Sequence, residues 1–143
     1  MKRTRLKKQS KQPISKLQRK LWEVCRKIAL IRAQNRSGHV FCFTCDSGPL
    51  SGSNMQLGHF IPKSVCGAYL KYDLRNLRFQ CMRCNIHGGG MGAEFYRRLV
   101  ETEGKAYVDQ LFQDKNKIVK AYDHFLSTLI QYESILNSNN TMI

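Results

Sequence analysis

Four of the six cysteines in this chain lie in two C-x-x-C pairs, Cys42 with Cys45 and Cys81 with Cys84. Thiolates three residues apart on a tight turn can share one zinc ion, and two such turns supply its four tetrahedral ligands. A single pair could be a redox dithiol, but two pairs favour a metal site. The sequence therefore predicts a structural Zn²⁺ bound by all four cysteines, with no position open for catalysis.

The residues beside the cysteine pairs could form a second, different metal site. His59 lies between the pairs in the segment MQLGHFIP, and Asn85 and His87 follow Cys84 at the start of a glycine-rich turn. Carboxamide oxygens and neutral imidazoles can bind a divalent cation, and a histidine without a metal can take a proton from water. In a basic protein this set fits metal-assisted hydrolysis of phosphodiester bonds. His87 could instead support the zinc site or begin a helix.

The charge of the chain points to a polyanionic partner. The 143 residues carry 24 Lys and Arg against 10 Asp and Glu, a net charge of +14, and residues 1–20 contain nine basic side chains and no acid. Such an excess favours nucleic acid first and an anionic membrane second, whereas the plainest alternative is solubility alone. No apolar run reaches the roughly 18 residues of a membrane span, so we expect no transmembrane helix. The basic start leads into no apolar segment, so we expect no signal peptide.

The elements that must position these residues divide the chain into four parts. Residues 1–13 are a basic arm that we expect to be disordered, and residues 14–38 have the apolar periodicity of a helix. Residues 39–103 begin with short apolar pieces broken by turn residues, and residues 104–143 are expected to be helical. The last helix has a heptad-like apolar stripe, which packs on its own domain or forms a contact in a homodimer. The predicted fold class is α+β, a small zinc-stabilised core flanked by an N-terminal helix and C-terminal helices.

The order of the motifs resembles that of the HNH, or ββα-metal, endonucleases. The pieces CFTC, GHF and LRNLRFQCMRCNIHGGG follow one another within a stretch from about Phe41 to Leu111. This stretch most closely resembles the NinG family of lambdoid phages, also called Rap, whose members are recombination endonucleases. The asparagine directly after the last cysteine also resembles phage endonuclease VII, a junction resolvase. Each motif alone is weak, but their combined order is specific.

The resemblance implies a role for each residue of the second site. By position, His59 is the expected general base that deprotonates the attacking water, and Asn85 is the expected ligand of a catalytic Mg²⁺ or Mn²⁺, with His87 as the next candidate. Asn76 matches the middle asparagine of the HNH pattern, which supports the segment that carries the catalytic histidine. The resemblance also implies branched DNA or recombination intermediates, such as Holliday junctions and D-loops, as substrates. It places the activity of this phage or prophage protein in the cytoplasm of a bacterial host.

The chain departs from the family pattern at the expected acidic ligand. Many HNH enzymes have an acid directly before the catalytic histidine, where this chain has Gly58. NinG relatives often have Asp three residues before that histidine, where this chain has Gln56. A neutral amide is a poorer ligand for a hard cation. The cation is then expected to rest on the segment after Cys84 and on waters, or to recruit Asp73 or Glu94.

Basic residues around the motifs are candidates for phosphate contacts, because a guanidinium group can hold two phosphate oxygens at once. They are Lys63, Arg75, Arg78, Arg83, Arg97 and Arg98. The sequence thus predicts a metal-dependent DNA endonuclease that binds Zn²⁺ and either Mg²⁺ or Mn²⁺. Two alternatives stay open: a zinc-stabilised nucleic-acid-binding protein without catalysis, and an HNH protein that assists a phage terminase in DNA packaging.

Overall fold

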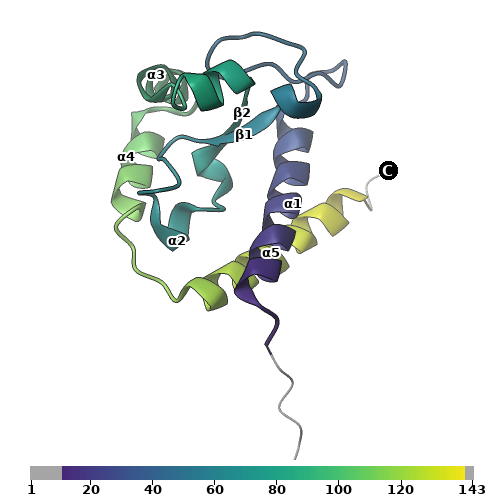
Figure 1. The fold of residues 1–143 in the computed structure, drawn as a ribbon, viewed down its shortest axis with the longest axis vertical. Coiled ribbons are helices and arrows are strands. Elements are labelled where there is room, and N and C mark those ends of the chain that lie inside the picture. Colours follow the sequence, from purple (N-terminus) through teal and green to yellow (C-terminus); the bar gives the residue numbers. More distant parts are fainter. Residues whose placement is uncertain (1–10, 141–143) are drawn as a thin grey trace, which may run out of the picture.

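The computed structural model describes residues 11–140, so most of the predicted basic arm lies outside the described residues. Two antiparallel strands, β1 (Gln56–His59) and β2 (Leu77–Gln80), form one small sheet in which His59 pairs with Leu77. The α helices are α1 (Ile14–Ala33), α2 (Gly67–Leu70), α3 (Gly92–Glu103), α4 (Lys105–Asp114) and α5 (Ala121–Asn140). Shorter helical turns span Gly52–Asn54, Leu74–Asn76 and Arg83–His87. This combination confirms the predicted α+β class (Figure 1).

Helix α1 forms because its apolar residues recur on one face. Leu17, Leu21, Cys25 and Ile28 are all buried, at spacings of three and four residues. The helix ends at Ala33, earlier than the predicted residue 38. The side chain of Asn35 accepts hydrogen bonds from the backbone N–H groups of residues 37 and 39, each 3.0 Å long. An asparagine that bonds to its own turn in this way competes with continuation of a helix.

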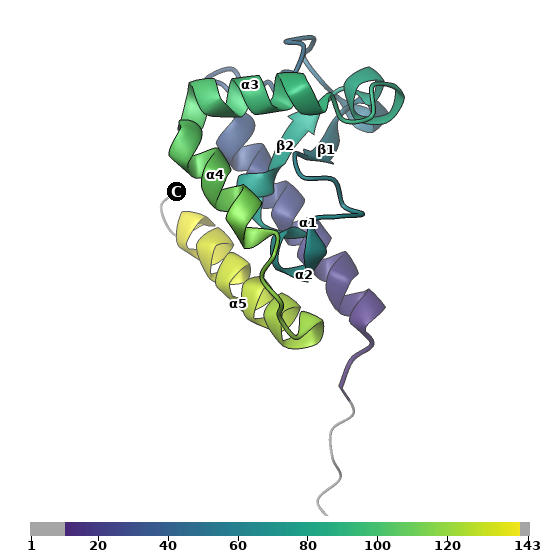
Figure 2. The same cartoon turned by 90° about the vertical axis from the view of Figure 1, so that its left-hand side faces the viewer.

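Helix α5 uses its apolar stripe within the same chain. Phe125, Leu129 and Tyr132 are buried in a cluster with residues of α1, and Figures 1 and 2 show the two helices side by side. The Tyr132 hydroxyl donates a 2.9 Å hydrogen bond to the carbonyl of Tyr72. Ile118 precedes the helix and is 99% exposed, so it takes no part in this packing. The stripe therefore packs on its own domain, and the homodimer stays a prediction.

Two apolar clusters hold the sheet between the helices. The first joins α1 and α5 to the strand residues Leu57, Leu77 and Phe79. The second joins Phe60 and Ile61, which directly follow β1, to α2, α3 and α4. His59 thus lies where the chain passes from one cluster to the other, and Figure 1 shows the strands between α1 and the α3–α4 pair. No helix within residues 11–140 has the length and apolar character needed to cross a membrane.

Candidate functional site

The two C-x-x-C turns meet in space and form one cysteine cluster. The Sγ atoms of Cys42, Cys45, Cys81 and Cys84 all lie within 4.8 Å of one another, and the Cys45 and Cys81 sulfurs are 3.7 Å apart. A tetrahedral ion with metal–sulfur bonds of about 2.3 Å requires sulfurs about 3.8 Å apart. The cluster could therefore hold a metal ion such as zinc. The first turn is tied to β2, because the backbone N–H of Phe43 donates to a strand carbonyl over 2.9 Å.

The electrostatics of the cluster also suit a bound cation. Burial raises the pKa of the Cys84 thiol, and the neighbouring sulfurs raise it further. Burial also acts to raise the pKa of Cys45, but hydrogen bonds with Ser47 outweigh it and bring the pKa to about 6. Four thiolates so close together repel one another, so a cation is needed to ionise them all. Arg83 is exposed beside Cys45 and contributes positive charge, since this contact raises the pKa of the guanidinium.

The imidazole of His59 is held on two sides. Its Nε2 lies 2.8 Å from the carbonyl oxygen of Lys71, and its ring stacks on Trp22 with the centroids 5.7 Å apart. Burial lowers the pKa of His59, and the positive charges of Lys63 and Lys71 lower it further. The Lys71 ammonium is itself held by α1, because it donates a 2.6 Å hydrogen bond to Gln18 Oε1. The ring therefore has a fixed orientation in a positively charged setting.

Asn76 is fully buried and binds the segment that follows His59. Its Oδ1 accepts from the backbone N–H of Ile61 over 2.7 Å, and its Nδ2 donates to the Ile61 carbonyl over 3.1 Å. The Asn76 carbonyl also accepts from the backbone N–H of Phe60 over 2.8 Å. These three bonds fix the chain where it leaves β1, immediately after the histidine.

Asn85 lies on the π-helical turn Arg83–His87, next to the strand that carries His59. Its Nδ2 donates a 2.9 Å hydrogen bond to Gln56 Oε1, and a Cβ atom placed on Gly58 would lie 2.9 Å from its Oδ1. The amide nitrogen is thus engaged, whereas the oxygen faces the residue directly before His59. The structure brings Asn85 to the strand that carries the candidate base.

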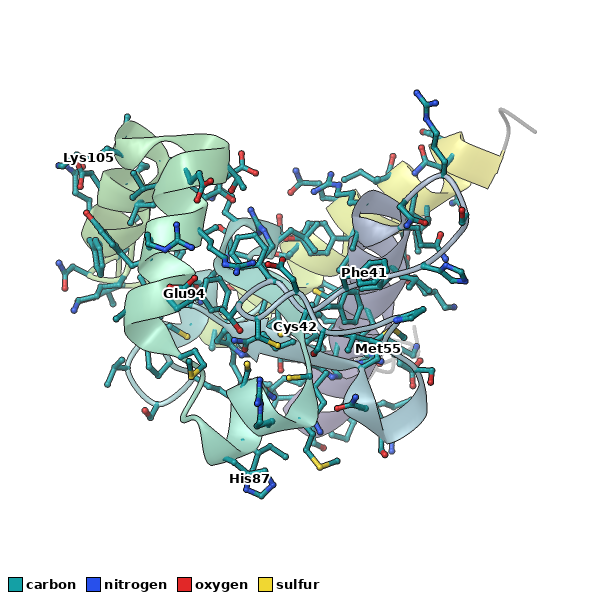
Figure 3. The ribbon with its side chains drawn as sticks, turned by 90° about the horizontal axis from the view of Figure 1, so that it is seen from above. Phe41, Cys42, Met55, His87, Glu94 and Lys105 are labelled. Atoms are coloured by element: carbon teal, nitrogen blue, oxygen red, sulfur yellow. The ribbon has the colours of Figure 1, made fainter. Side chains whose placement is uncertain are left out.

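His87 is placed differently from Asn85. It is exposed, and Figure 3 shows its ring at the edge of the molecule, pointing outward. The physical reason is the helical turn, because residues two apart on a helix face different sides. The two acids considered as substitute ligands are also engaged: Asp73 bonds to Arg75, and Glu94 bonds to two arginines of α3.

Four of the six predicted phosphate contacts are ion-paired within the chain. These pairs join Arg75 to Asp73 and Asp114, Arg78 to Glu103, Arg97 to Glu94 and Glu101, and Arg98 to Asp46 and Glu94. Lys63 and Arg83 are exposed and have no carboxylate partner in the described part of the chain. These two are therefore the basic residues of the set that no carboxylate neutralises, and of them Arg83 also contacts the Cys45 sulfur.

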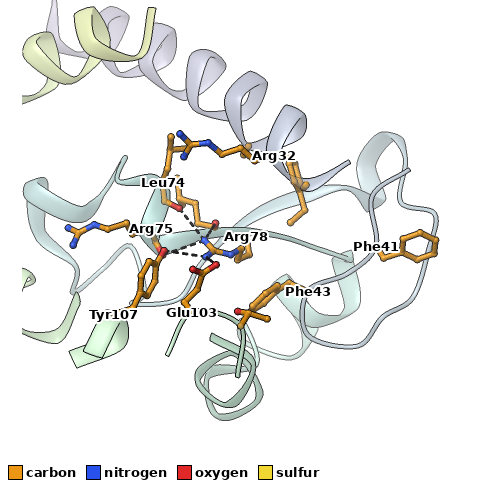
Figure 4. Close-up of a pocket in the computed structure, with 13 residues that line it drawn as sticks. Arg32, Phe41, Phe43, Leu74, Arg75, Arg78, Glu103 and Tyr107 are labelled. Atoms are coloured by element: carbon orange, nitrogen blue, oxygen red, sulfur yellow. Dashed lines mark hydrogen bonds and ion pairs between the residues drawn. The ribbon is translucent and has the colours of Figure 1, made fainter. Parts of the chain in front are cut away.

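Arg78 projects into a hollow of about 540 Å³ beside the C-terminal end of α1 (Figure 4). Its guanidinium donates to the carbonyl of Leu77 over 2.8 Å and to the Tyr107 hydroxyl over 3.2 Å. Aromatic side chains of Phe41 and Phe43 also line the hollow, whereas His59 does not. Arg78 thus organises the wall of a hollow that is separate from the candidate base.

Three residues of the site carried no usable signal in the sequence. Trp22 is the only tryptophan of the chain, but it lies on a helix outside the cysteine pairs. Lys71 contributes a backbone carbonyl, which no residue type encodes. Gln80 is a fully buried polar residue on β2. Its polar side chain is not distinctive, because β2 also contains Arg78.

Comparisons with known proteins identify the family. The family model described as Bacteriophage Lambda NinG protein matches residues 1–137. Protein ninG of Salmonella phage P22 is 30% identical over 89 residues, which cover 62% of this chain and 41% of that protein. Protein ninG of Escherichia phage 933W is 28% identical over 89 residues, covering 62% of this chain and 42% of that protein. No solved structure matches the chain.

The match to the family model extends over nearly the whole sequence, whereas the matched part of the chain spans about two-fifths of the length of these curated relatives. The chain belongs to the NinG family of bacteriophage lambda.

Proposed function

We propose that this chain is a metal-dependent DNA endonuclease of the HNH type, which hydrolyses phosphodiester bonds. The observation that carries the proposal is the hydrogen bond between His59 Nε2 and the carbonyl of Lys71, 2.8 Å long. A carbonyl oxygen only accepts hydrogen bonds, so Nε2 must carry the proton. The lone pair of the neutral ring then lies on Nδ1, which can accept a proton from water.

The surroundings of His59 favour this neutral, basic state. Burial lowers its pKa below the ordinary value for histidine, so the ring is neutral at pH 7. Trp22 fixes the plane of the ring, and Asn76 fixes the backbone after it. A general base held in one orientation loses little entropy when the substrate binds. Lys63 and Lys71 add positive charge near the ring, which favours the approach of a phosphate.

The divalent cation is assigned to the Asn85 oxygen, beside the residue that directly precedes His59. Asn85 Oδ1 would be its first protein ligand, because the amide nitrogen is already engaged with Gln56. A bound Mg²⁺ or Mn²⁺ would polarise the scissile phosphate and stabilise charge on the departing oxygen. His87 is left out of this set, because its ring points away from the molecule. In this proposal β1, β2 and the turn Arg83–His87 are the ββα-metal unit, and the cysteine cluster holds a structural Zn²⁺.

Branched DNA is the proposed substrate class. The support is membership of the NinG family, together with the resemblance of the motifs to junction-cutting nucleases. The net charge of +14 favours a polyanionic substrate, and the exposed Lys63 and Arg83 are the proposed phosphate contacts near the motifs.

The proposal is tested by incubating the zinc-loaded chain with a four-way junction and with linear duplex DNA, in the presence of Mg²⁺, Mn²⁺ or EDTA. Metal-dependent products, with the junction cut faster than the duplex, are expected. A salt-sensitive shift of the DNA in gels without any products would instead identify a nucleic-acid-binding protein without catalysis.

A further inference from the structure

Among the described residues, Gln80 carries a buried side-chain oxygen without a hydrogen-bond donor. The side chain is fully buried, and its Nε2 donates to the Thr44 hydroxyl over 3.0 Å and to the Gly90 carbonyl over 2.9 Å. Its Oε1 has no hydrogen-bond partner within residues 11–140. An unpaired buried carbonyl costs roughly 1–3 kcal/mol, so its presence calls for an explanation.

The unpaired oxygen faces the place where Gly58 lacks a side chain. A Cβ atom on Gly58 would collide with Gln80 Oε1 and would lie 2.9 Å from Asn85 Oδ1. Glycine is therefore required at position 58 for as long as Gln80 fills this space. Two carboxamide oxygens converge on the position from which an acidic side chain at residue 58 would extend.

Hydrogen bonds fix the direction of the side-chain amides of Asn85 and Gln80. Gln56 and Gln80 are opposite each other across the sheet. Gln56 Oε1 accepts a hydrogen bond from Asn85 Nδ2. The Gln80 nitrogen is taken by Thr44 and Gly90, as described above. With both nitrogens engaged, only oxygens are left to face each other beside Gly58. Two carbonyl oxygens that face each other repel, unless a donor or a cation lies between them.

We propose that Gln80 is a ligand of the divalent cation, and that its Oε1 acts with Asn85 Oδ1 in place of the carboxylate that Gly58 cannot supply. This inference rests on the proposed function, because the cation is the one assigned there to Asn85. Carboxamide oxygens are hard ligands that suit Mg²⁺, Mn²⁺ and Ca²⁺. The space beside Asn85 admits either a glutamine at position 80 or an acid at position 58, but not both.

The test measures Mn²⁺ binding to the zinc-loaded full chain without DNA, from the electron paramagnetic resonance signal of free Mn²⁺. Gln80→Met keeps the length of the side chain but removes the oxygen, and it is expected to weaken Mn²⁺ binding by roughly tenfold or more. Gln110→Met makes the same substitution at an exposed glutamine of α4, which bonds to Asp114 and not to the residues around Gly58, and it is the matched control that keeps the wild-type affinity. Gly58→Asp combined with Gln80→Ala is expected to bind Mn²⁺ at least as tightly as the wild type, because the acid occupies the vacated space.

Three results would overturn the inference: a wild-type chain that binds no Mn²⁺, a Gln80→Met chain that binds it as the wild type does, or a double variant no better than Gln80→Ala alone. If Gln80→Met does not fold, the double variant decides. Failure of the proposed function would give a different result: the chain would bind Mn²⁺ through Gln80 but would not cleave DNA. Metal-dependent cleavage with unchanged Mn²⁺ affinity in Gln80→Met overturns this inference alone.

Discussion

The imidazole of His59 lies flat on the indole of Trp22, with the ring centroids 5.7 Å apart and the two planes only 2° from parallel. The indole also meets Tyr72 edge-on, at a centroid distance of 6.2 Å. Helix α1 thus carries one wall of the histidine site, although it precedes the first cysteine pair. The candidate site is therefore larger than the cysteine-bounded motif, because the N-terminal helix orients the proposed base.

Replacing Trp22 tests this role of α1. In Trp22→Ala the imidazole becomes exposed to water, so the pKa of His59 is expected to rise toward its ordinary value and DNA cleavage is expected to slow. Trp22→Phe keeps a flat ring and is expected to retain most of the activity. The pKa is followed by NMR titration of the His59 ring protons, and cleavage by single-turnover assays. An unchanged His59 pKa in Trp22→Ala would show that the indole does not shield the ring.

The pH dependence of cleavage follows from the lowered pKa of His59. A base must be neutral, so cleavage is expected to fall only as the pH drops below about 6.5, through the lowered pKa. The free energy of unfolding also falls at low pH, because His59 holds its proton less tightly in the folded chain than in the unfolded chain. The contribution of His59 is thus fully present above about pH 6.5 and is lost as the pH falls through the folded pKa. A rate profile with its acidic midpoint above that value would contradict the assignment.

Removal of one cluster thiolate is expected to remove the structural metal. The wild-type chain should contain one zinc per chain, whereas Cys84→Ser should lose it together with much of its thermal stability, because metal binding is coupled to folding. Cys66→Ser is the matched control, since Cys66 is a buried thiol outside the cluster. Zinc content by atomic absorption and thermal unfolding by circular dichroism give the two readouts. Equal zinc content in both variants would rule out the four-cysteine site.

Two basic residues from the predicted phosphate contacts should behave in opposite ways. Arg75 bonds to Asp114, whose side chain is only 3% exposed, at 2.8 Å. Arg75→Ala removes one partner of this buried carboxylate, which keeps Lys117 at 3.2 Å and Gln110 at 2.9 Å, and is expected to lower the free energy of unfolding by roughly 1–2 kcal/mol. Lys63→Ala should leave stability unchanged, weaken DNA binding and reduce its salt dependence by about one counterion. Stability is measured by denaturant unfolding, and DNA binding by assays at several salt concentrations. The same defect in both variants would contradict the separate roles assigned to Arg75 and Lys63.

The cysteine cluster and the α+β class could be predicted from the sequence, because both depend on local patterns. A C-x-x-C pair is four residues long, and the stripe of α1 repeats within one helix. The meeting of the two pairs followed from ligand chemistry, since one ion needs four thiolates. The closeness of Asn85 to the β1 strand followed from the two cysteine pairs, which bracket His59 in the sequence.

The remaining features depend on tertiary contacts. Helix α1 ends at Ala33, before the predicted residue 38, because the side chain of Asn35 bonds to its own turn. The outward direction of His87 depended on the helical form of its turn. The engagement of Arg75 depended on Asp114, which lies 39 residues away in the sequence. Such pairings between distant segments leave no spacing that a sequence pattern can reveal.

The central claim is most directly tested by single-turnover cleavage of a four-way junction with zinc-loaded His59→Ala and His124→Ala. His124 is a close internal match: its Nε2 lies 3.2 Å from the carbonyl of Tyr69, and its ring stacks on that tyrosine at a centroid distance of 5.1 Å. We predict that His59→Ala loses metal-dependent cleavage while it keeps its zinc and its circular dichroism spectrum, and that His124→Ala cleaves as the wild type does. Wild-type cleavage by His59→Ala would contradict the account.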